Sequence, residues 1–346
     1  MDIVIGLLII AIGAFCQSSC YVPINRIKRL ELGVVLAGSG RVCLAVFPRC
    51  WVRLLAVPAG HSLFELFAGA SGLDVAMTIL FGVLWGVGGL TFGLSMRYLG
   101  VALGQSISLG TCAGLGTILA PVILNVFYPE AHHLEKLTAS VIIGVVVTLV
   151  GIAIIGVAGN MKSQSLSEEE KKAAVKDFNF PKGIAIALLA GFMSGCFNVG
   201  LEFGSSIHFE ESADMFKTLP ATFLVTLGGF VTNAVYCFFQ NGKNRTWGDY
   251  RKGNVWTNNL VFCALAGVLW YSQFFGLALR QGLPSSSSPV LMTFAFCILM
   301  ALNVVFSNVW GIILKEWKGC SPKTITVLVI GLAVLIVSSF LPQLLG

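Results

Sequence analysis

The word GVLW occurs twice in this chain, at residues 82–85 and again at residues 267–270. A second word follows each copy in the same order, FGLSMR at residues 92–97 and FGLALR at residues 275–280. The two pairs are offset by 185 and 183 residues, so they align with a gap of two. Because each copy ends an apolar segment on an arginine, we interpret the pair as an internal repeat that maps the first half of the chain onto the second.

The composition excludes most classes of soluble protein. Of the 346 residues, 56% are hydrophobic and 11% are charged, whereas roughly a quarter of the residues of a soluble domain are charged. A soluble globule of this length could not cover its surface with so few charges. Disordered, collagen-like and coiled-coil chains need polar or strictly periodic compositions. The composition therefore predicts an all-α, polytopic membrane protein whose surroundings are the lipid bilayer.

Ten stretches are long and apolar enough to cross a bilayer, which takes about 20 mostly apolar residues. They are residues 3–22, 34–57, 75–96, 99–126, 138–158, 183–204, 219–240, 258–279, 289–314 and 324–344. The repeat maps the first five spans onto the last five. Since five is odd, the second half must enter the membrane the opposite way round, which gives a 5+5 inverted repeat. We expect the halves to be residues 1–159 and 183–346, joined by a polar cytoplasmic linker at residues 160–182.

The basic residues predict the orientation of the chain. Of the 22 lysines and arginines, 16 fall in the gaps after odd-numbered spans, and only Lys136, Lys217 and Arg280 fall after even-numbered spans. Cytoplasmic loops are enriched in lysine and arginine, so we expect both termini on the outer side. The net charge of +6 then reflects topology, and no nucleic-acid partner is expected because the basic residues form no soluble face. The ten cysteines show no paired spacing, so no metal site is expected.

The inverted repeat favours a secondary transporter over other membrane proteins. Two similar halves of opposed orientation can exchange conformations, which opens the cavity between them first to one side and then to the other. An enzyme is not expected, since no metalloprotease, nucleophile or phosphate-loop motif occurs in a suitable context. A structural or signalling protein of the membrane would usually carry a soluble domain. Within transport, a different small solute, imported or exported, stays an open alternative.

Longer motifs around the repeat carry a resemblance to a known family. FGVLWGVG at 81–88, GLSMRYLG at 93–100, WYSQFF at 270–275 and WGIILKEW at 310–317, followed by TVL at 326–328, resemble the bacterial L-rhamnose–proton symporter family. The resemblance implies a ten-helix member of the drug/metabolite transporter superfamily in the bacterial inner membrane, so the outer side that the basic residues predict for both termini would be the periplasm. It also implies uptake of L-rhamnose, or of a related deoxyhexose, with a proton as the coupling ion and without a cofactor.

Residues 30–53 depart from the family pattern. This stretch carries Arg41, Arg49 and Arg53, and each would cost roughly 2.5–3.5 kcal/mol near the centre of a membrane helix. One hypothesis is a shifted reading frame. Codons for residues 30–37, read one base later, can encode Trp-Ser-Trp-Glu-Ser-Ser-Trp, which resembles the Trp/Ser/Glu-rich entry of the second helix in the family. Sequencing this stretch of DNA again tests the hypothesis. The four serines at 285–288 are a second departure.

A sugar site needs two kinds of group. Sugar hydroxyls pair with amides or carboxyls that donate and accept together, and the apolar face and methyl group of the sugar need an aromatic wall. Trp270, Tyr271 and Gln273 fall within one turn of the eighth expected span. Trp85 is the repeat partner of Trp270. We expect these four residues to bind substrate; the alternative for the aromatic residues is an interface belt or helix packing.

Polar residues inside other spans are further substrate-binding candidates, because polar groups are expensive within a bilayer. Gln105 lies in the fourth expected span, Asn303 and Asn308 in the ninth, and Gln17 in the first. The alternative for each of them is a hydrogen bond between helices.

Glu202 is the predicted proton carrier. It is the one carboxylate well within the register of an expected span, near the end of the sixth, and Asn198 lies one turn before it. The alternative is an ordinary glutamate at the outer membrane surface. Asp74 and His208, at the ends of expected helices, are weaker candidates. The oligomeric state stays open.

Overall fold

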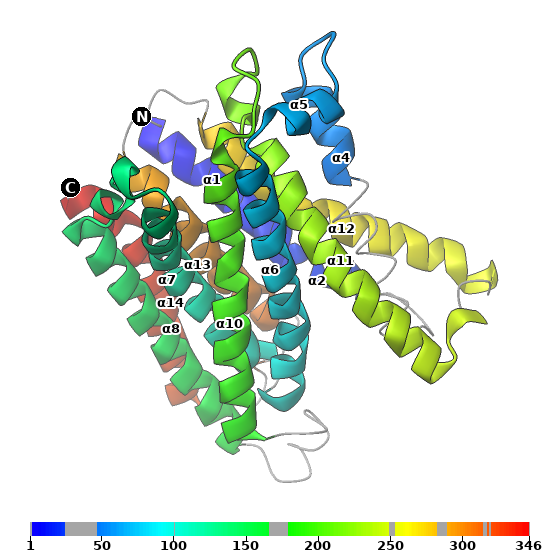
Figure 1. Cartoon of the computed structure of the whole chain (residues 1–346). Helices are drawn as coiled ribbons and strands as arrows, with labels where there is room; N and C mark the ends of the chain where they lie inside the picture. The colour runs from blue at the N-terminus through cyan, green and yellow to red at the C-terminus, as the bar shows by residue number, and fades with distance from the viewer. Residues whose placement is uncertain are drawn as a thin grey trace. The chain divides into compact units, whose positions relative to one another are not determined.

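The computed structural model describes most of the chain as helices. The described residues are 2–24, 47–99, 101–165, 179–248, 253–281, 289–313, 317 and 320–345. Seven helical segments in these ranges are long and apolar enough to cross a membrane (Figure 1). They are Gly72–Leu99, Gly104–Phe127, Ala139–Lys162, Pro181–Ser206, Asp214–Asn244, Thr293–Ile313 and Pro322–Pro342. Two shorter apolar segments, Val4–Ser19 and Val261–Phe274, belong to further helices.

The long helices coincide with the expected spans. They are α1 (Asp2–Ser19), α6 (Gly72–Leu99), α7 (Val101–Phe127), α8 (Ala139–Ser165), α10 (Phe180–Phe203), α11 (Leu219–Asn244), α12 (Gly253–Gln281), α13 (Pro289–Ile313) and α14 (Pro322–Leu345). The prediction of an all-α, multi-pass membrane protein is thus confirmed for the part of the chain that the structure describes.

The second expected span, residues 34–57, lies mostly outside the described residues. Its end forms α4 (Phe47–Trp51) and a π-helical turn, η2 (Val52–Ala56). Arg49 and Arg53 are exposed there. Since this span is only partly described, the ten-helix 5+5 arrangement stays a prediction. Arg41, the four serines at 285–288 and linker residues 166–178 also lie outside the described residues.

Short elements connect the long helices. After η2 comes α5 (Leu63–Gly69), a short helix that the hydropathy pattern does not predict. The remaining short elements are α2 (Tyr21–Ile24), η3 (Pro129–Ala131), η4 (His133–Lys136), η5 (Gly204–Ser206) and η6 (Asp214–Phe216). Four of the long helices carry a proline in their first turn, where its missing N–H is not needed. These prolines are Pro181, Pro220, Pro289 and Pro322.

The chain divides into two compact units that do not coincide with its sequence halves. The first unit comprises residues 1–86 and 200–285, and the second comprises residues 87–199 and 286–346. Each unit therefore combines segments from both expected halves. Helix α6 passes from the first unit to the second after Gly86.

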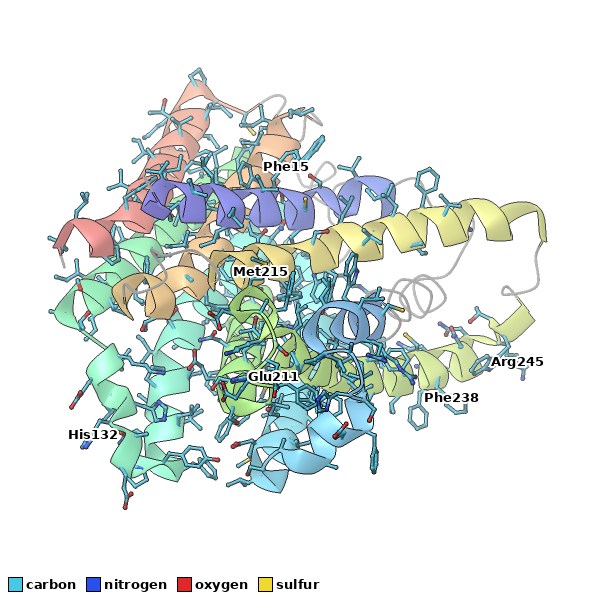
Figure 2. All side chains as sticks on the ribbon, turned by 90° about the horizontal axis from the view of Figure 1, so that it is seen from above. Phe15, His132, Glu211, Met215, Phe238 and Arg245 are labelled. Carbon is cyan, nitrogen blue, oxygen red and sulfur yellow. The ribbon has the colours of Figure 1, made fainter. Side chains whose placement is uncertain are left out.

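In the first unit, α1 lies along α12 (Figure 2). Glycines permit the close approach of helices in this unit. A Cβ on Gly13 of α1 would lie 3.0 Å from the Cα of Gln273. On α6, Gly82 lies directly against the backbone of Val225 on α11. Small residues of this kind are typical of helix contacts in membranes, because they let backbones approach.

The connections at one end of the first unit pack on each other. Ser62 caps α5 by accepting from the Glu65 N–H, and the Glu65 side chain accepts from Ser62 N–H. The Ser212 hydroxyl, between η5 and η6, donates to the Ala56 carbonyl at 2.8 Å. Buried Leu66 lies in the same apolar cluster as Ala56. These contacts hold the chain after η2 against the connection between α10 and α11.

In the second unit, α8 and α14 pack along each other in opposite directions. Gly144 lies against Pro342 near the start of α8, whereas Gly331 lies against Ile155, about three turns further along α8. Between these points Thr148 donates to the Ser338 hydroxyl at 3.0 Å. As the residue numbers of the contacts rise along α8, they fall along α14, which defines an antiparallel pair.

Helices α7 and α13 form a second antiparallel pair in the same unit. Gln105 lies opposite Ser307, and Gly116 lies opposite Phe296. The second unit thus contains two antiparallel pairs. Each consists of one helix from the first sequence half and one from the second.

Candidate functional site

Four aromatic side chains gather in the first unit. The repeat-related Trp85 and Trp270 stack on each other, with ring centroids 5.6 Å apart and an interplanar angle of 25°. Phe274 meets Trp270 edge-on at 5.3 Å, and Tyr271 meets Phe274 at 5.4 Å. Both tryptophans are half-buried, whereas Tyr271 and Phe274 are buried. The structure thus brings together three of the predicted aromatic residues and adds Phe274.

Gln273 carries a buried polar atom without a partner. Its side chain is 1% exposed. Its Nε2 donates to the Trp270 carbonyl at 2.9 Å, but its Oε1 has no hydrogen-bond partner within the described part of the protein. Leaving a buried acceptor unpaired costs about 1–3 kcal/mol. A polar atom kept in such a position points to a ligand hydroxyl or a bound water as its partner.

Helix α1, which lies along α12, approaches it closely at this glutamine. Gly13 touches the Gln273 backbone, so any larger residue at Gly13 would push α1 away. Gln17 lies one turn further along α1 and is half-buried. The pairing of α1 with α12 therefore places a second amide-bearing residue on the helix that packs against Gln273.

Glu202 is half-buried near the end of α10, and its carbonyl accepts from the Ser205 hydroxyl at 2.7 Å. The weaker candidates lie beyond this helix end. Asp74, at the start of α6, accepts from the Ser206 hydroxyl at 2.9 Å. The Nε2 atom of His208 lies 3.9 Å from a Glu210 carboxylate oxygen.

The other predicted residues lie in the second unit. The Nε2 atom of Gln105 donates to the Ser307 hydroxyl at 2.8 Å, which joins α7 to α13. Asn303 is 1% exposed and lies one turn before Ser307 on α13. Asn308 donates to the Val304 carbonyl of its own helix at 2.9 Å. Gln105 and Asn303 therefore belong to one buried polar region, whereas the Asn308 amide is engaged by its own helix.

Sequence reasoning missed three contributors. Phe274 lies within the WYSQFF motif and could have been found as an aromatic residue beside Gln273. Ser307 lies four residues after Asn303, which places both on one face of a helix. Gly13 gave no signal, because glycines are frequent throughout the chain. The first unit assembles aromatic rings and amides, and the second unit assembles amides and a hydroxyl; such groups suit a neutral polyhydroxyl ligand better than an ion.

Apolar helices that bury amides and hydroxyls define a multi-pass membrane protein with a polar interior. The chain belongs to the L-rhamnose-proton symport protein (RhaT) family, whose family model matches residues 1–344. The resemblance found in the sequence motifs is thereby confirmed. The family is one of transporters and not of enzymes.

Curated relatives extend along nearly the whole chain. The L-rhamnose-proton symporter of Yersinia pestis bv. Antiqua (strain Antiqua) is 27% identical over 346 residues, which cover 97% of this chain and 96% of that protein. The L-rhamnose-proton symporter of Yersinia pseudotuberculosis serotype O:1b (strain IP 31758) matches with the same identity and coverage.

Proposed function

We propose that this protein imports L-rhamnose, or a closely related deoxyhexose, together with a proton across the bacterial inner membrane by alternating access. Membership of the symport protein family supports the reaction class. The main structural support for the location of the sugar site is the unpaired Oε1 of Gln273 beside the Trp85–Trp270 stack.

The chemistry of this region fits a neutral deoxysugar. The C–H face and the methyl group of the sugar bury their apolar surface against Trp270 or Tyr271. The Gln273 Oε1 accepts a hydrogen bond from a sugar hydroxyl, which satisfies an atom that otherwise has no partner. Gln17, in the same unit, is a further candidate for the remaining hydroxyls, whereas Gln105, Asn303 and Asn308, in the second unit, remain predicted substrate-binding residues.

We also propose the 5+5 inverted repeat with halves 1–159 and 183–346. The close contact of α1 with α12 at Gly13 and Gln273 has a counterpart where α10 meets α6. There, a Cβ on Gly88 would lie 2.7 Å from the Ser194 nitrogen. The offsets from Gly13 to Ser194 and from Gly88 to Gln273 are 181 and 185 residues, close to those of the repeated words. The antiparallel pairs α8–α14 and α7–α13 support the same arrangement.

The charges of the second unit support the proposed orientation. Basic residues mark one end of its described helices. They are Arg97, Lys162, Lys182 and Lys323. The opposite end, around η3 and η4, carries Glu130 and Glu135 with Lys136. By the positive-inside rule the first end faces the cytoplasm. Helix α14 begins at that end, so its C-terminus is periplasmic, and we place the N-terminus on the same side.

Glu202 is the proposed proton carrier. A carrier must take up a proton from water on one side and release it on the other, and a half-buried carboxylate near the end of a helix suits this role. One proton that enters down 100 mV releases about 2.3 kcal/mol, and each pH unit adds about 1.4 kcal/mol. Together they suffice to accumulate a neutral sugar roughly tens- to hundreds-fold.

Uptake of labelled L-rhamnose into proteoliposomes under an imposed inward proton gradient tests the proposal. We expect accumulation that a protonophore abolishes. Glu202→Gln should lose accumulation but keep the exchange of labelled for unlabelled sugar, since exchange needs no net proton movement. Glu211→Gln, an exposed control, should keep both. No uptake by the native chain, or uptake indifferent to the protonophore, contradicts the proposed function.

A further inference from the structure

The Trp85–Trp270 stack joins two residues that are equivalent in the repeat. Each ends a GVLW word, and the centroids of the two stacked rings lie 5.6 Å apart. When two copies are related by an axis in the membrane plane, only residues next to that axis meet their own counterparts. The stack therefore marks the position of the axis. A sugar site alone does not require this arrangement.

Symmetry gives this contact a special property during transport. In alternating access by inverted repeats, each copy takes up the conformation that the other copy had before. The distance between a residue and its counterpart is then the same in both states, because exchanging the two copies leaves that pair unchanged. Contacts between non-equivalent residues behave differently. For example, in the second state the Gly13–Gln273 contact would take the geometry that the Ser194–Gly88 contact had in the first state, and the reverse.

We propose that the Trp85–Trp270 stack is the fixed pivot of the transport cycle, a contact that the inward-facing and outward-facing states both keep. This inference rests on the proposed alternating-access function and adds the element about which the two copies move.

The surroundings of the stack suit a pivot. Trp85 immediately precedes Gly86, the last residue of α6 that belongs to the first compact unit. The pivot thus lies where the chain passes from one unit to the other. Gly229 on α11 lies directly against the Trp85 ring and leaves no room for a Cβ. Phe274 supports Trp270 edge-on. Both rings are therefore held by neighbouring groups in the first unit.

A fixed stack also restricts where the sugar binds. Rings in contact at 5.6 Å leave no space for a pyranose between them. The sugar must use an outer face or edge of the pair, together with Gln273. This distinguishes a pivot from a clamp, in which the two rings would separate to hold the sugar.

Spin labels test the pivot without disturbing the stack. We would label Leu84→Cys with Leu269→Cys, the equivalent positions directly before each tryptophan, after replacing the native cysteines. A control pair, His132→Cys with Glu211→Cys, places one label in each compact unit on exposed connections (Figure 2). Dipolar electron paramagnetic resonance in nanodiscs then measures both distances at acidic and alkaline pH, with and without L-rhamnose.

We expect the Leu84–Leu269 distance to stay constant under conditions that change the His132–Glu211 distance. A change in both distances overturns the pivot. A control distance that never changes, in protein that does not take up L-rhamnose, overturns the alternating-access function on which the pivot rests.

Cross-linking gives an independent measure. A short, cleavable bis-thiol linker between the same two cysteines should leave proton-driven rhamnose uptake in place, because the cycle does not separate these positions. Uptake that stops on cross-linking and returns when the linker is cleaved refutes the pivot.

Discussion

Replacing Gln273 with methionine should separate stability from sugar binding. Methionine has nearly the same shape, so the aromatic packing around it is retained. The substitution removes an unpaired buried acceptor, a gain of about 1–3 kcal/mol, and loses the bond to the Trp270 carbonyl, a loss of about 0.5–1.5 kcal/mol. We therefore expect the stability of the sugar-free protein to lie between about 0.5 kcal/mol below and about 2.5 kcal/mol above that of the native chain.

Binding should change in the opposite direction. A sugar hydroxyl that loses its partner in a buried site costs about 1–3 kcal/mol, which weakens affinity roughly 5- to 150-fold. Thermal unfolding in detergent measures both effects, as the unfolding temperature without sugar and as the increase that L-rhamnose produces. The matched control is Gln240→Met on α11. Its amide donates to the Tyr236 hydroxyl at 2.8 Å on an exposed part of the helix, and the substitution should leave rhamnose binding unchanged.

The opposite result would refute the reasoning. If Gln273→Met lowers the unfolding temperature and leaves the rhamnose-induced increase intact, then Gln273 has a structural role and the sugar binds elsewhere.

Three further predictions test the packing. Gly88→Ala should destabilise the protein by about 1–3 kcal/mol through overpacking, whereas Gly89→Ala, whose Cβ would meet nothing within 4 Å, should be neutral or stabilising; equal unfolding temperatures would contradict the close approach at Gly88. Thr148→Val and Ser338→Ala should each cost about 0.6 kcal/mol or more, and the double variant little more than either alone; additive losses in a double-mutant cycle would mean that the two hydroxyls do not interact. Ser62→Ala should cost about 1 kcal/mol by removing the α5 cap, seen as faster proteolysis of the connection around α5; unchanged cleavage would show that the cap contributes nothing.

The long helices were predictable because apolar length alone defines a membrane span. Residues 289–314, for example, match α13 (Pro289–Ile313) almost to the residue, since a proline begins the helix. The short helix α5 was not predictable from hydropathy, because it depends on a capping box and on packing against the connection between α10 and α11.

The site was predictable in part for a similar reason. The repeated word singled out Trp85 and Trp270, and the structure places their rings in contact. Sequence spacing could not show that Gly13 of α1 packs against Gln273 of α12, because that contact joins residues far apart in the chain. The division into two compact units has the same origin, since it depends on which helices pack together and not on their order.

The pairing of α1 with α12 has a consequence for biosynthesis. More than 230 residues separate the end of α1 at Ser19 from the start of α12 at Gly253. A ribosome that adds about 5–20 residues per second leaves α1 without its partner for roughly 10–50 s. During that interval Gly13 and Gln17 must be tolerated by lipid or shielded by the insertion machinery. A nascent chain released before α12 has been made leaves the first unit unfinished and its polar groups open to quality-control proteases.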